Sequence, residues 1–493
     1  MSPAELSPAG HVVVVGGGLA GLTAAIALRE AGLPVTLLEA RPRLGGATSS
    51  FSRDGLIVDT GQHVFLGCCT AYRELIARLG MTGSVSVQNR FDVTVLSPHG
   101  RARLRRTGLP GPLHFGRALA TYSLLSPAER LRVSQAALAM RFLDPARPGL
   151  DAQRLGDWLA AHGQGERARR VLWDLFTVSA LNVSGDDANL SLAATVVRTA
   201  LLGAKDAADI GTPGIPLGDL HGQAGARLLD RLGATVRLNA KVAGVRPRPG
   251  GGYRIELAER RTASDQTASD QTAGDQTAGD QTVDALQADG VVLAVPPDTA
   301  ARLLPAGPPT PGPGPDRWRE LGASPIVNVH VIYDQPVTRQ PFVAAVESPV
   351  QWVFDRTRPS GLTAGQYLAI SLSAADEIVD TPAAVLRERF VPALEQLFPA
   401  AREARITDFF VTRERRATFR QVPGCGEKRP GAGTGREGLV LAGAWTDTGW
   451  PDTMEGAVRS GLIAARELRR EMAAAGRGFP AAGRAAAAAG SPS

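Results

Sequence analysis

Three glycines near the start of the chain have the spacing of a dinucleotide-binding turn. Gly16, Gly18 and Gly21 follow the apolar run HVVVV and open a segment with helical spacing of apolar residues. Without a Cβ atom, they let the backbone approach a pyrophosphate at the positive end of a helix. Glu39 ends the next apolar run, where its carboxylate can accept hydrogen bonds from an adenosine ribose. The pattern predicts a βαβ unit that binds NAD or FAD.

The residues after Glu39 favour FAD over NAD. Arg41 and Arg43 precede a second glycine pair, Gly45 and Gly46. This pair offers more bare backbone to a pyrophosphate that the first loop already holds, which suits a long, extended cofactor. A plain turn is the alternative interpretation.

A third glycine-rich element lies near the C-terminus. An apolar strand ends at Gly443, and we expect a helix to begin near Pro451 and Asp452, because proline suits a first helical turn. If this helix points its N-terminus at the flavin ring, its dipole stabilises negative charge on the reduced ring. Gly456 and Gly461 would let the helix lie close to the cofactor or to the first βαβ unit.

Together, the three elements resemble the flavin-dependent amine oxidase and phytoene desaturase superfamily. Within it, residues 59–80 and 446–461 are similar to the hydroxysqualene dehydroxylase branch, and the likeness covers residues 11–470. The resemblance implies an α/β fold in which a Rossmann-like FAD-binding domain is interleaved with an α+β substrate domain.

The resemblance also implies which residues hold FAD. By this resemblance, the ADP part is bound by the two glycine loops and the residues around them: Gly16, Gly18, Gly21, Glu39, Arg41, Gly45 and Gly46. Val242 matches the position whose backbone meets adenine. The flavin falls to two further segments: Gly61, Gln62 and His63, and Gly443, Met454 and Ala457. Two positions depart from the family pattern, since Ala47 replaces an arginine and Ala444 an acidic residue.

For the chemistry, the resemblance implies reductive removal of the allylic hydroxyl of hydroxysqualene to give squalene, in hopanoid or related triterpene synthesis. Hydroxide is a poor leaving group, so the site needs a proton donor beside the hydride donor. The candidate acids are His63, Asp447, Asp452 and Glu455, with His63 first. A histidine that only orders its loop, and helix-capping roles for Asp452 and Glu455, remain open. No metal site is expected.

Two other functions remain open. An oxidative desaturase acting on phytoene or a similar polyene would use the same site in the opposite redox sense. A non-catalytic lipid escort protein would keep the fold without the flavin, which Ala47 and Ala444 favour and the intact glycine motif disfavours.

Composition shifts divide the chain into interleaved parts. We expect three FAD-binding parts, at residues 11–85, 210–300 and 436–472. We expect a helical substrate-domain part at residues 86–209 and a substrate-domain sheet and helix at residues 301–435. Residues 262–282, with their repeated DQT, predict a low-complexity insert without a role, and residues 473–493 a disordered tail.

The charge balance and the cysteines limit the possible partners and the cellular compartment. The 54 basic and 48 acidic residues give a net charge of only +6, so no nucleic-acid partner is expected. Three cysteines without a CxxC pair, and a start without signal-peptide features, predict a cytoplasmic protein. Its electron donor is not identified.

A C30 isoprenoid substrate needs a long apolar tunnel, and contact with the inner face of a membrane is one way to load it. Any such contact must be peripheral, because no apolar run reaches about 18 residues. The residues considered for a mouth beside the basic cluster at residues 101–106 are Leu113, Phe115, Leu119, Tyr122, Leu124 and Leu125. Ordinary core is the favoured interpretation for them.

Overall fold

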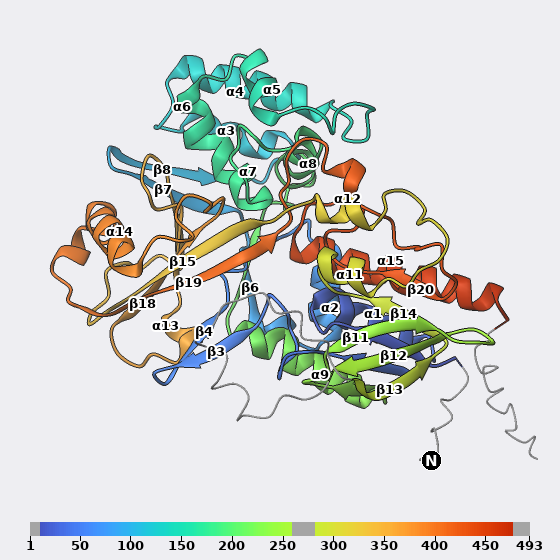
Figure 1. Ribbon diagram of the computed structural model, residues 1–493. Coiled ribbons are helices and arrows are strands. Elements are labelled where there is room, and N and C mark those ends of the chain that lie inside the picture. Colours follow the sequence, from blue (N-terminus) through green and yellow to red (C-terminus); the bar gives the residue numbers. More distant parts are fainter. Residues whose placement is uncertain (1–9, 259–281, 477–493) are drawn as a thin grey trace, which may run out of the picture.

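The computed structural model describes residues 10–258 and 282–476. The DQT-containing insert, apart from its last residue, and most of the predicted tail lie outside these ranges. Figure 1 shows a parallel sheet with helices, a large and mostly antiparallel sheet beside it, and a layer of helices at one end. Within the described part, no helix combines the length and the apolar content needed to cross a membrane.

The parallel sheet has five strands drawn from distant parts of the chain. Its order is β10 (Thr235–Arg237), β2 (Val35–Leu38), β1 (Val12–Val15), β14 (Gly290–Leu293) and β20 (Leu439–Leu441). The strands β1, β2, β14 and β20 are buried on both faces, which explains their uninterrupted apolar sequences. The predicted βαβ unit at the N-terminus is therefore confirmed.

Different layers cover the two faces of this sheet. Val12 and Val14 pack towards four helices: α1 (Leu19–Glu30), α2 (Thr70–Arg78), α9 (Ala224–Arg231) and α15 (Met454–Ala474). Val13 and Val15 pack in the cluster that includes a three-stranded sheet: β11 (Val242–Pro247), β12 (Tyr253–Ala258) and β13 (Thr282–Ala288).

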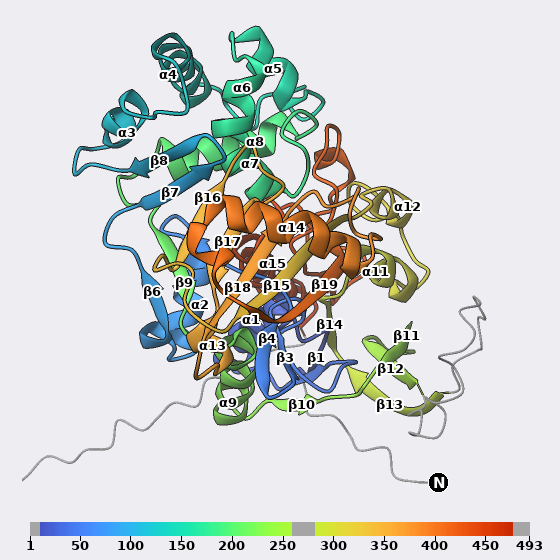
Figure 2. The same ribbon diagram turned by 90° about the vertical axis from the view of Figure 1, so that its left-hand side faces the viewer.

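The second large sheet has seven strands. Its order is β19 (Ile406–Thr418), β15 (Ser324–Tyr333), β18 (Gln366–Leu372), β17 (Trp352–Asp355), β16 (Phe342–Ala345), β7 (Asp92–Ser97) and β8 (Gly100–Arg105). Figure 2 shows α14 (Ala383–Leu397) lying across its outer face, where Val327 and Val329 meet Leu386 and Phe390. The opposite face packs Phe410 against Val58 of the hairpin β3 (Ser50–Arg53) and β4 (Leu56–Asp59).

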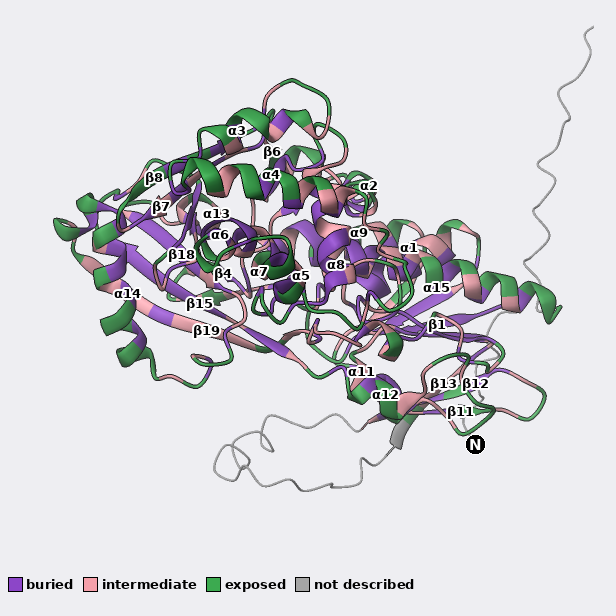
Figure 3. Cartoon of the chain, turned by 90° about the horizontal axis from the view of Figure 1, so that it is seen from above, coloured by how far each residue is buried: buried purple, intermediate pink, exposed green. Residues whose placement is uncertain are grey.

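The helical layer sits above both sheets. It contains α3 (Gly116–Ala120), α4 (Pro127–Arg141), α5 (Leu155–Ala161), α6 (Glu166–Ala168), α7 (Asp174–Leu181) and α8 (Leu190–Val196). Seen from above in Figure 3, α3 and α4 are mostly exposed.

One expectation about a single segment is wrong. Residues 100–105 form strand β8 rather than the start of a helical region, because arginines alternate with the buried Ala102 and Leu104. Residues 235–247 form two strands in two different sheets, because Asn239 adopts a left-handed conformation (φ 52°) between them. Helix α15 extends to Ala474, two residues into the predicted tail.

Candidate cofactor and active site

The glycine elements meet at the carboxyl edge of the parallel sheet. Gly16 follows β1 with φ +106°, and a Cβ there would overlap the carbonyl oxygen of Ala294, which follows β14. A Cβ on Gly21 would overlap the carbonyl of Gly16 itself. These two glycines are therefore required by the close packing of strand and helix, as in dinucleotide-binding folds.

Gly18 is different, because the space beside it is open. Its backbone is ordinary (φ −73°, ψ 179°), and a Cβ would meet only the Cα of Gly46, at 3.9 Å. The second glycine loop is bonded to the first, since the Gly45 N–H donates to the Gly17 carbonyl (2.8 Å). The two loops thus form one bare backbone surface at the N-terminus of α1, which fits the pyrophosphate of FAD.

Glu39 fastens the two loops together. Its carboxylate is buried and accepts hydrogen bonds from the Gly17 N–H (2.7 Å) and the Arg41 N–H (2.8 Å). Each carboxylate oxygen keeps a lone pair for a further donor, such as the ribose predicted from the sequence. The Arg41 side chain is exposed, and the buried Val242 begins β11.

The C-terminal glycine element is held by its neighbours. Gly443 has φ +144°, and the Trp445 indole occupies the place where a Cβ would lie. That indole donates to the Val295 carbonyl (3.0 Å), and the Gly443 N–H donates to Ser460 Oγ (2.5 Å). The loop after β20 is thereby joined to β14 and to α15.

Helix α15 begins later than predicted. It starts at Met454, and the Thr453 hydroxyl caps it by accepting from the Gly456 N–H (3.2 Å). Pro451 and Asp452 lie before this cap rather than in the first turn. A Cβ on Gly461 would overlap the Ala20 carbonyl, so this glycine lets α15 pack closely on α1.

Arg429 is a site residue that the sequence analysis missed. It is buried, and its guanidinium donates to the carbonyls of Ala444 (3.1 Å), Trp445 (3.3 Å) and Thr446 (2.6 Å). It therefore holds the loop that follows β20. An isolated arginine in the sequence GEKRPG carries no signal of such a contact.

Replacing Arg429 by methionine is expected to weaken FAD binding about tenfold or more, because three loop carbonyls lose a charged donor. FAD titration monitored by flavin fluorescence measures the effect. Arg436→Met is the matched control, since Arg436 also bonds carbonyls, those of Pro305 and Thr434. Equal loss of FAD in both variants would contradict a specific role for Arg429.

Of the four candidate acids, Glu455 has hydrogen bonds that indicate a structural role rather than a catalytic one. Its buried carboxylate accepts from the Ala71 N–H (3.2 Å) and the Tyr72 N–H (2.7 Å), at the start of α2. It also accepts from Arg459 Nε, at 2.8 Å. Glu455 thus caps α2 from α15, and three hydrogen bonds hold its carboxylate there.

Glu455→Ala is expected to lower the free energy of unfolding by about 2–3 kcal/mol, because it leaves two backbone donors and a charged guanidinium without their acceptor. Urea denaturation followed by circular dichroism measures this change. Glu467→Ala, which removes a surface pair with Arg470 on the same helix, should cost less than about 1 kcal/mol. Similar losses in the two variants would argue against the capping role.

Asp447 and Asp452 occupy the loop before α15 in different settings. Asp447 is exposed and accepts from the Gly449 N–H (3.2 Å) within a turn. Asp452 accepts from the Phe419 N–H (2.8 Å). Burial raises the pKa of Asp452 to about 6, although this hydrogen bond and the nearby Arg429 act in the opposite direction. Asp452 therefore carries a proton in part of the molecules near neutral pH.

His63 follows the hairpin β3–β4 and lies beside Phe354 and Arg356, at the end of strand β17 of the seven-stranded sheet. Its Nδ1 is 3.2 Å from the Gly61 carbonyl, and burial lowers the pKa of the imidazole. Beside it, Asp59 and Arg356 form a buried ion pair. A small pocket of about 60 Å³ has Gln62, His63, Phe354 and Arg356 among its lining residues. The imidazole is thus favoured in its neutral form.

The sheet face above this region is largely aromatic. Phe342, Trp352 and Phe354 lie on it, and the Trp352 indole donates to Ser179 Oγ of α7 (2.8 Å). In the same row as Trp352, Asn328 is fully buried, and neither polar atom of its amide has a partner in the described part of the chain. This face therefore combines apolar surface with unused hydrogen-bonding capacity.

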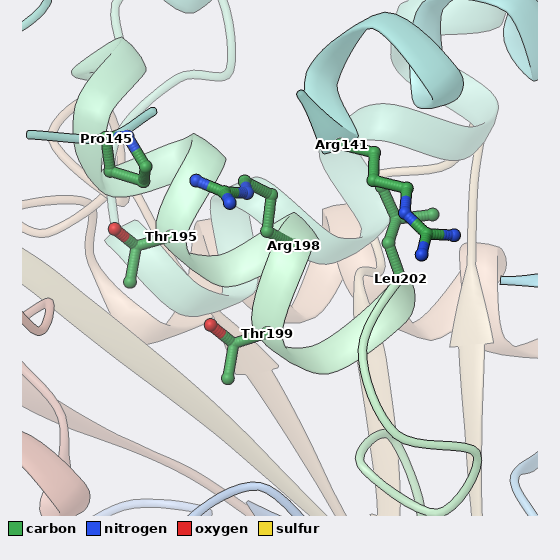
Figure 4. Close-up of a pocket in the computed structure, with 6 residues that line it drawn as sticks. All are labelled: Arg141, Pro145, Thr195, Arg198, Thr199 and Leu202. Atoms are coloured by element: carbon green, nitrogen blue, oxygen red, sulfur yellow. The ribbon is translucent and has the colours of Figure 1, made fainter. Parts of the chain in front are cut away.

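A larger pocket, of about 420 Å³, lies elsewhere, in the helical layer. Its lining residues are Arg141, Pro145, Thr195, Arg198, Thr199 and Leu202. Figure 4 shows Thr195, Arg198 and Thr199 projecting from α8 and the turn that continues it, with Arg141 and Leu202 on the other side of the view. None of the predicted site residues lines it.

Comparison with known proteins adds a family and relatives. Residues 19–469 match the family described as flavin containing amine oxidoreductase. The chain is 30% identical to a hydroxysqualene dehydroxylase of Sinorhizobium fredii and 31% identical to one of Rhodopseudomonas palustris. Each match covers 92% of this chain and 97% of the relative. A 15-cis-phytoene desaturase of Glycine max is 24% identical over 95% of this chain and 80% of its own length.

Solved structures support the fold. Cyclohexylamine oxidase from Brevibacterium oxydans superimposes with a TM-score of 0.67 at 19% identity, covering 94% of this chain and all of the other. Putrescine oxidase superimposes with a TM-score of 0.65 at 21% identity, over 93% and 98% of the two chains. At these identities the likeness concerns the fold alone.

Proposed function

The chain belongs to the flavin-containing amine oxidoreductase family, and from that premise we propose that it reductively removes the allylic hydroxyl of hydroxysqualene to form squalene. It is an FAD-dependent oxidoreductase, and the proposal concerns its substrate and direction. The observation that carries it is the match to two hydroxysqualene dehydroxylases along nearly their whole length. The interleaved glycine elements and the aromatic sheet face are consistent with this assignment.

The cofactor site fits FAD. Gly18 and the Gly45–Gly46 pair offer bare backbone to the pyrophosphate, the Glu39 carboxylate keeps lone pairs that a ribose hydroxyl could use, and the loop held by Arg429 leads to the N-terminus of α15. When bound and reduced, FAD supplies the hydride for the allylic carbon. Ala47 and Ala444 do not remove any of these features, so the escort alternative loses its support.

Asp452 is the residue that we infer to be the acid. The reaction replaces a C–O bond by a C–H bond and releases water, so the departing hydroxyl needs a proton. Because the pKa of Asp452 is raised to about 6, its carboxyl holds a proton at a pH where most carboxyls are ionised. The lowered pKa of His63 keeps its imidazole neutral, so it holds no extra proton to give and is better suited to receive a hydrogen bond from the hydroxyl.

The aromatic sheet face is the region that we infer to hold the hydrocarbon. Phe342 and Phe354 belong to the same hydrophobic cluster as many residues of the helical layer, and Trp352 packs against it. Such a surface binds an isoprenoid by burial of apolar area rather than by polar contacts. The small pocket at His63 and Phe354 would place one end of this region beside the predicted flavin segment.

Oxidation of a polyene is the second candidate function. Phytoene desaturases match at 24–25% identity over 93–95% of this chain, and the same cofactor site would serve the opposite redox sense. Identity to the dehydroxylases is higher, at 30–31%, and the match covers 97% of their length against 79–80% of these desaturases.

The deciding experiment begins with an absorbance spectrum of the purified protein and anaerobic reduction of its flavin. Hydroxysqualene is then added, and the products are extracted. Reappearance of the oxidised flavin bands together with squalene is expected. A yellow protein that is inert to hydroxysqualene but oxidises phytoene would overturn the proposal in favour of the desaturase.

A further inference from the structure

One outward helix face in the helical layer is apolar. On α4, the buried residues Val133, Ala136 and Met140 form the inner face. Leu131 and Leu138 on α4, and Phe142 at its C-terminal end, are spaced by seven and four residues and share the opposite face. Their exposed fractions are 62%, 54% and 76%. The outer face of this helix therefore presents large apolar side chains to solvent. Figure 3 shows most of α4 in the colour of exposed residues.

Nearby segments extend this apolar surface. Leu109 and Leu113, in the segment before α3, are 52% and 61% exposed. Of the nine large hydrophobic residues that are exposed in the described part, five thus fall between residues 109 and 142. Helix α3 contacts both α4 and β8, and it also contacts the turn that contains Leu113. Such a concentration indicates an interaction surface rather than scattered surface residues.

The positive charge of the chain is concentrated in the same segment. Residues 100–142 contain eight arginines and a single acidic residue, Glu129. The rest of the chain carries 46 basic and 47 acidic residues, so this segment accounts for the whole net positive charge.

Half of these eight arginines have no acidic partner in the part of the chain that the structure describes. Arg103 and Arg105 share Asp92, and Arg106 pairs with Asp209. Four others have no ion-pair partner among the described residues: Arg101, Arg117, Arg132 and Arg141. Arg132 and Arg141 lie on opposite sides of the apolar stripe of α4. At 3.6 residues per turn, Arg132 is about 100° around the helix axis from the stripe in one direction and Arg141 about 80° in the other.

We propose that this face docks onto a lipid bilayer that contains anionic lipids. The docking face consists of an apolar centre and a basic border: Leu109, Leu113, Leu131, Leu138 and Phe142, with Arg101, Arg117, Arg132 and Arg141. An apolar stripe with arginines on both flanks matches a helix that lies in the membrane interface. The arginine stems cover apolar surface while their guanidinium groups reach the phosphates.

The docking face differs from the mouth considered in the sequence analysis. Tyr122, Leu124 and Leu125 are buried, and Phe115 and Leu119 are half-buried, as the core interpretation requires. Only Leu113 of that set lies on the docking face. The larger pocket, at the C-terminal end of α4, is lined by Arg141 of the docking face and by Arg198.

The docking face also suits the proposed reaction, and this link rests on the proposed function. A squalene-type substrate dissolves in the bilayer rather than in water. The helical layer that carries the docking face contributes to the hydrophobic cluster around Phe342 and Phe354. Docking would bring the substrate-binding layer next to the phase that holds the substrate.

The test is flotation of the FAD-loaded protein with vesicles. We expect flotation with phosphatidylcholine vesicles that contain about one third phosphatidylglycerol, and at least about tenfold less with phosphatidylcholine alone or at high salt. The triple variant Leu131→Gln, Leu138→Gln, Phe142→Gln should reduce binding about tenfold or more. The matched control Val385→Gln, at an exposed apolar position on α14, should bind like the wild type.

Three outcomes would overturn the proposal. They are absence of wild-type flotation with either vesicle, flotation that the triple variant leaves unchanged, and a concentration-dependent dimer that the triple variant abolishes. The flotation experiment contains no substrate, so its result tests membrane docking even if hydroxysqualene is not turned over. If hydroxysqualene is turned over, the triple variant should keep its rate in detergent micelles and lose it about tenfold in vesicles.

Discussion

Gly18→Val is expected to yield a folded protein that binds FAD about 100-fold or more weakly, the equivalent of losing two charge-assisted hydrogen bonds. The backbone of Gly18 is ordinary, and a Cβ there meets only Gly46 Cα at 3.9 Å, so the protein itself has room for the side chain. That room is the bare surface at the N-terminus of α1 where the pyrophosphate fits. Flavin absorbance and FAD titration measure the loss, and circular dichroism reports the fold.

Two comparisons make this result specific. Gly116→Val adds the same side chain at a helix start with nothing within 4 Å, and it should keep its FAD. Gly21→Val should instead damage the fold, because its Cβ overlaps the Gly16 carbonyl. A Gly18→Val protein that purifies with its full complement of FAD would show that the cofactor does not use this surface.

Asp452→Asn is expected to lower kcat for hydroxysqualene about 10²- to 10⁴-fold, the usual contribution of a general acid. The FAD spectrum should be unchanged, because the Phe419 N–H can still donate to the amide oxygen. Asp316→Asn, at an exposed position on the short helix α12 (Pro315–Arg319), is the control and should keep wild-type turnover. If Asp447→Asn or His63→Gln abolishes turnover while Asp452→Asn retains it, the assignment of the acid is wrong.

The pH dependence follows from the direction of the pKa shift. The acid must be protonated, so turnover of the wild type should fall as the pH rises through about 6, and this limb should be absent in Asp452→Asn. A carboxyl whose folded pKa is raised destabilises the fold above that pKa, where it must be ionised. Asp452→Asn should therefore be at least as stable as the wild type at pH 8, which separates loss of the acid from loss of the fold.

Much of the cofactor site could be predicted from local sequence. The three glycines of the first turn, Glu39 and the second glycine pair lie within about thirty residues, and the apolar run before them fixes their place at a strand end. The uninterrupted valines of β1 likewise reflect burial on both faces of a parallel sheet. Such features are encoded by spacing, which sequence displays directly.

The residues that the sequence left ambiguous are those whose roles depend on distant partners. Glu455 and Asp452 are both acidic residues near a helix start, yet Glu455 caps α2, which lies 384 residues away in sequence. Arg429 gave no signal at all, although it holds the loop after β20. Strand β8 was misjudged because the segment that follows it is helical and because the sheet that it joins through β7 lies mostly beyond residue 320.

By itself, then, the sequence determined the βαβ unit, its glycine turns and the family, because turn conformation and burial leave local patterns in the chain. Only the tertiary structure decided which of the candidate acids has a raised pKa, which arginine supports the loop after β20, and where apolar and basic residues share one surface. Desolvation and contacts through space depend on segments that are brought together from hundreds of residues apart, and no local pattern records them.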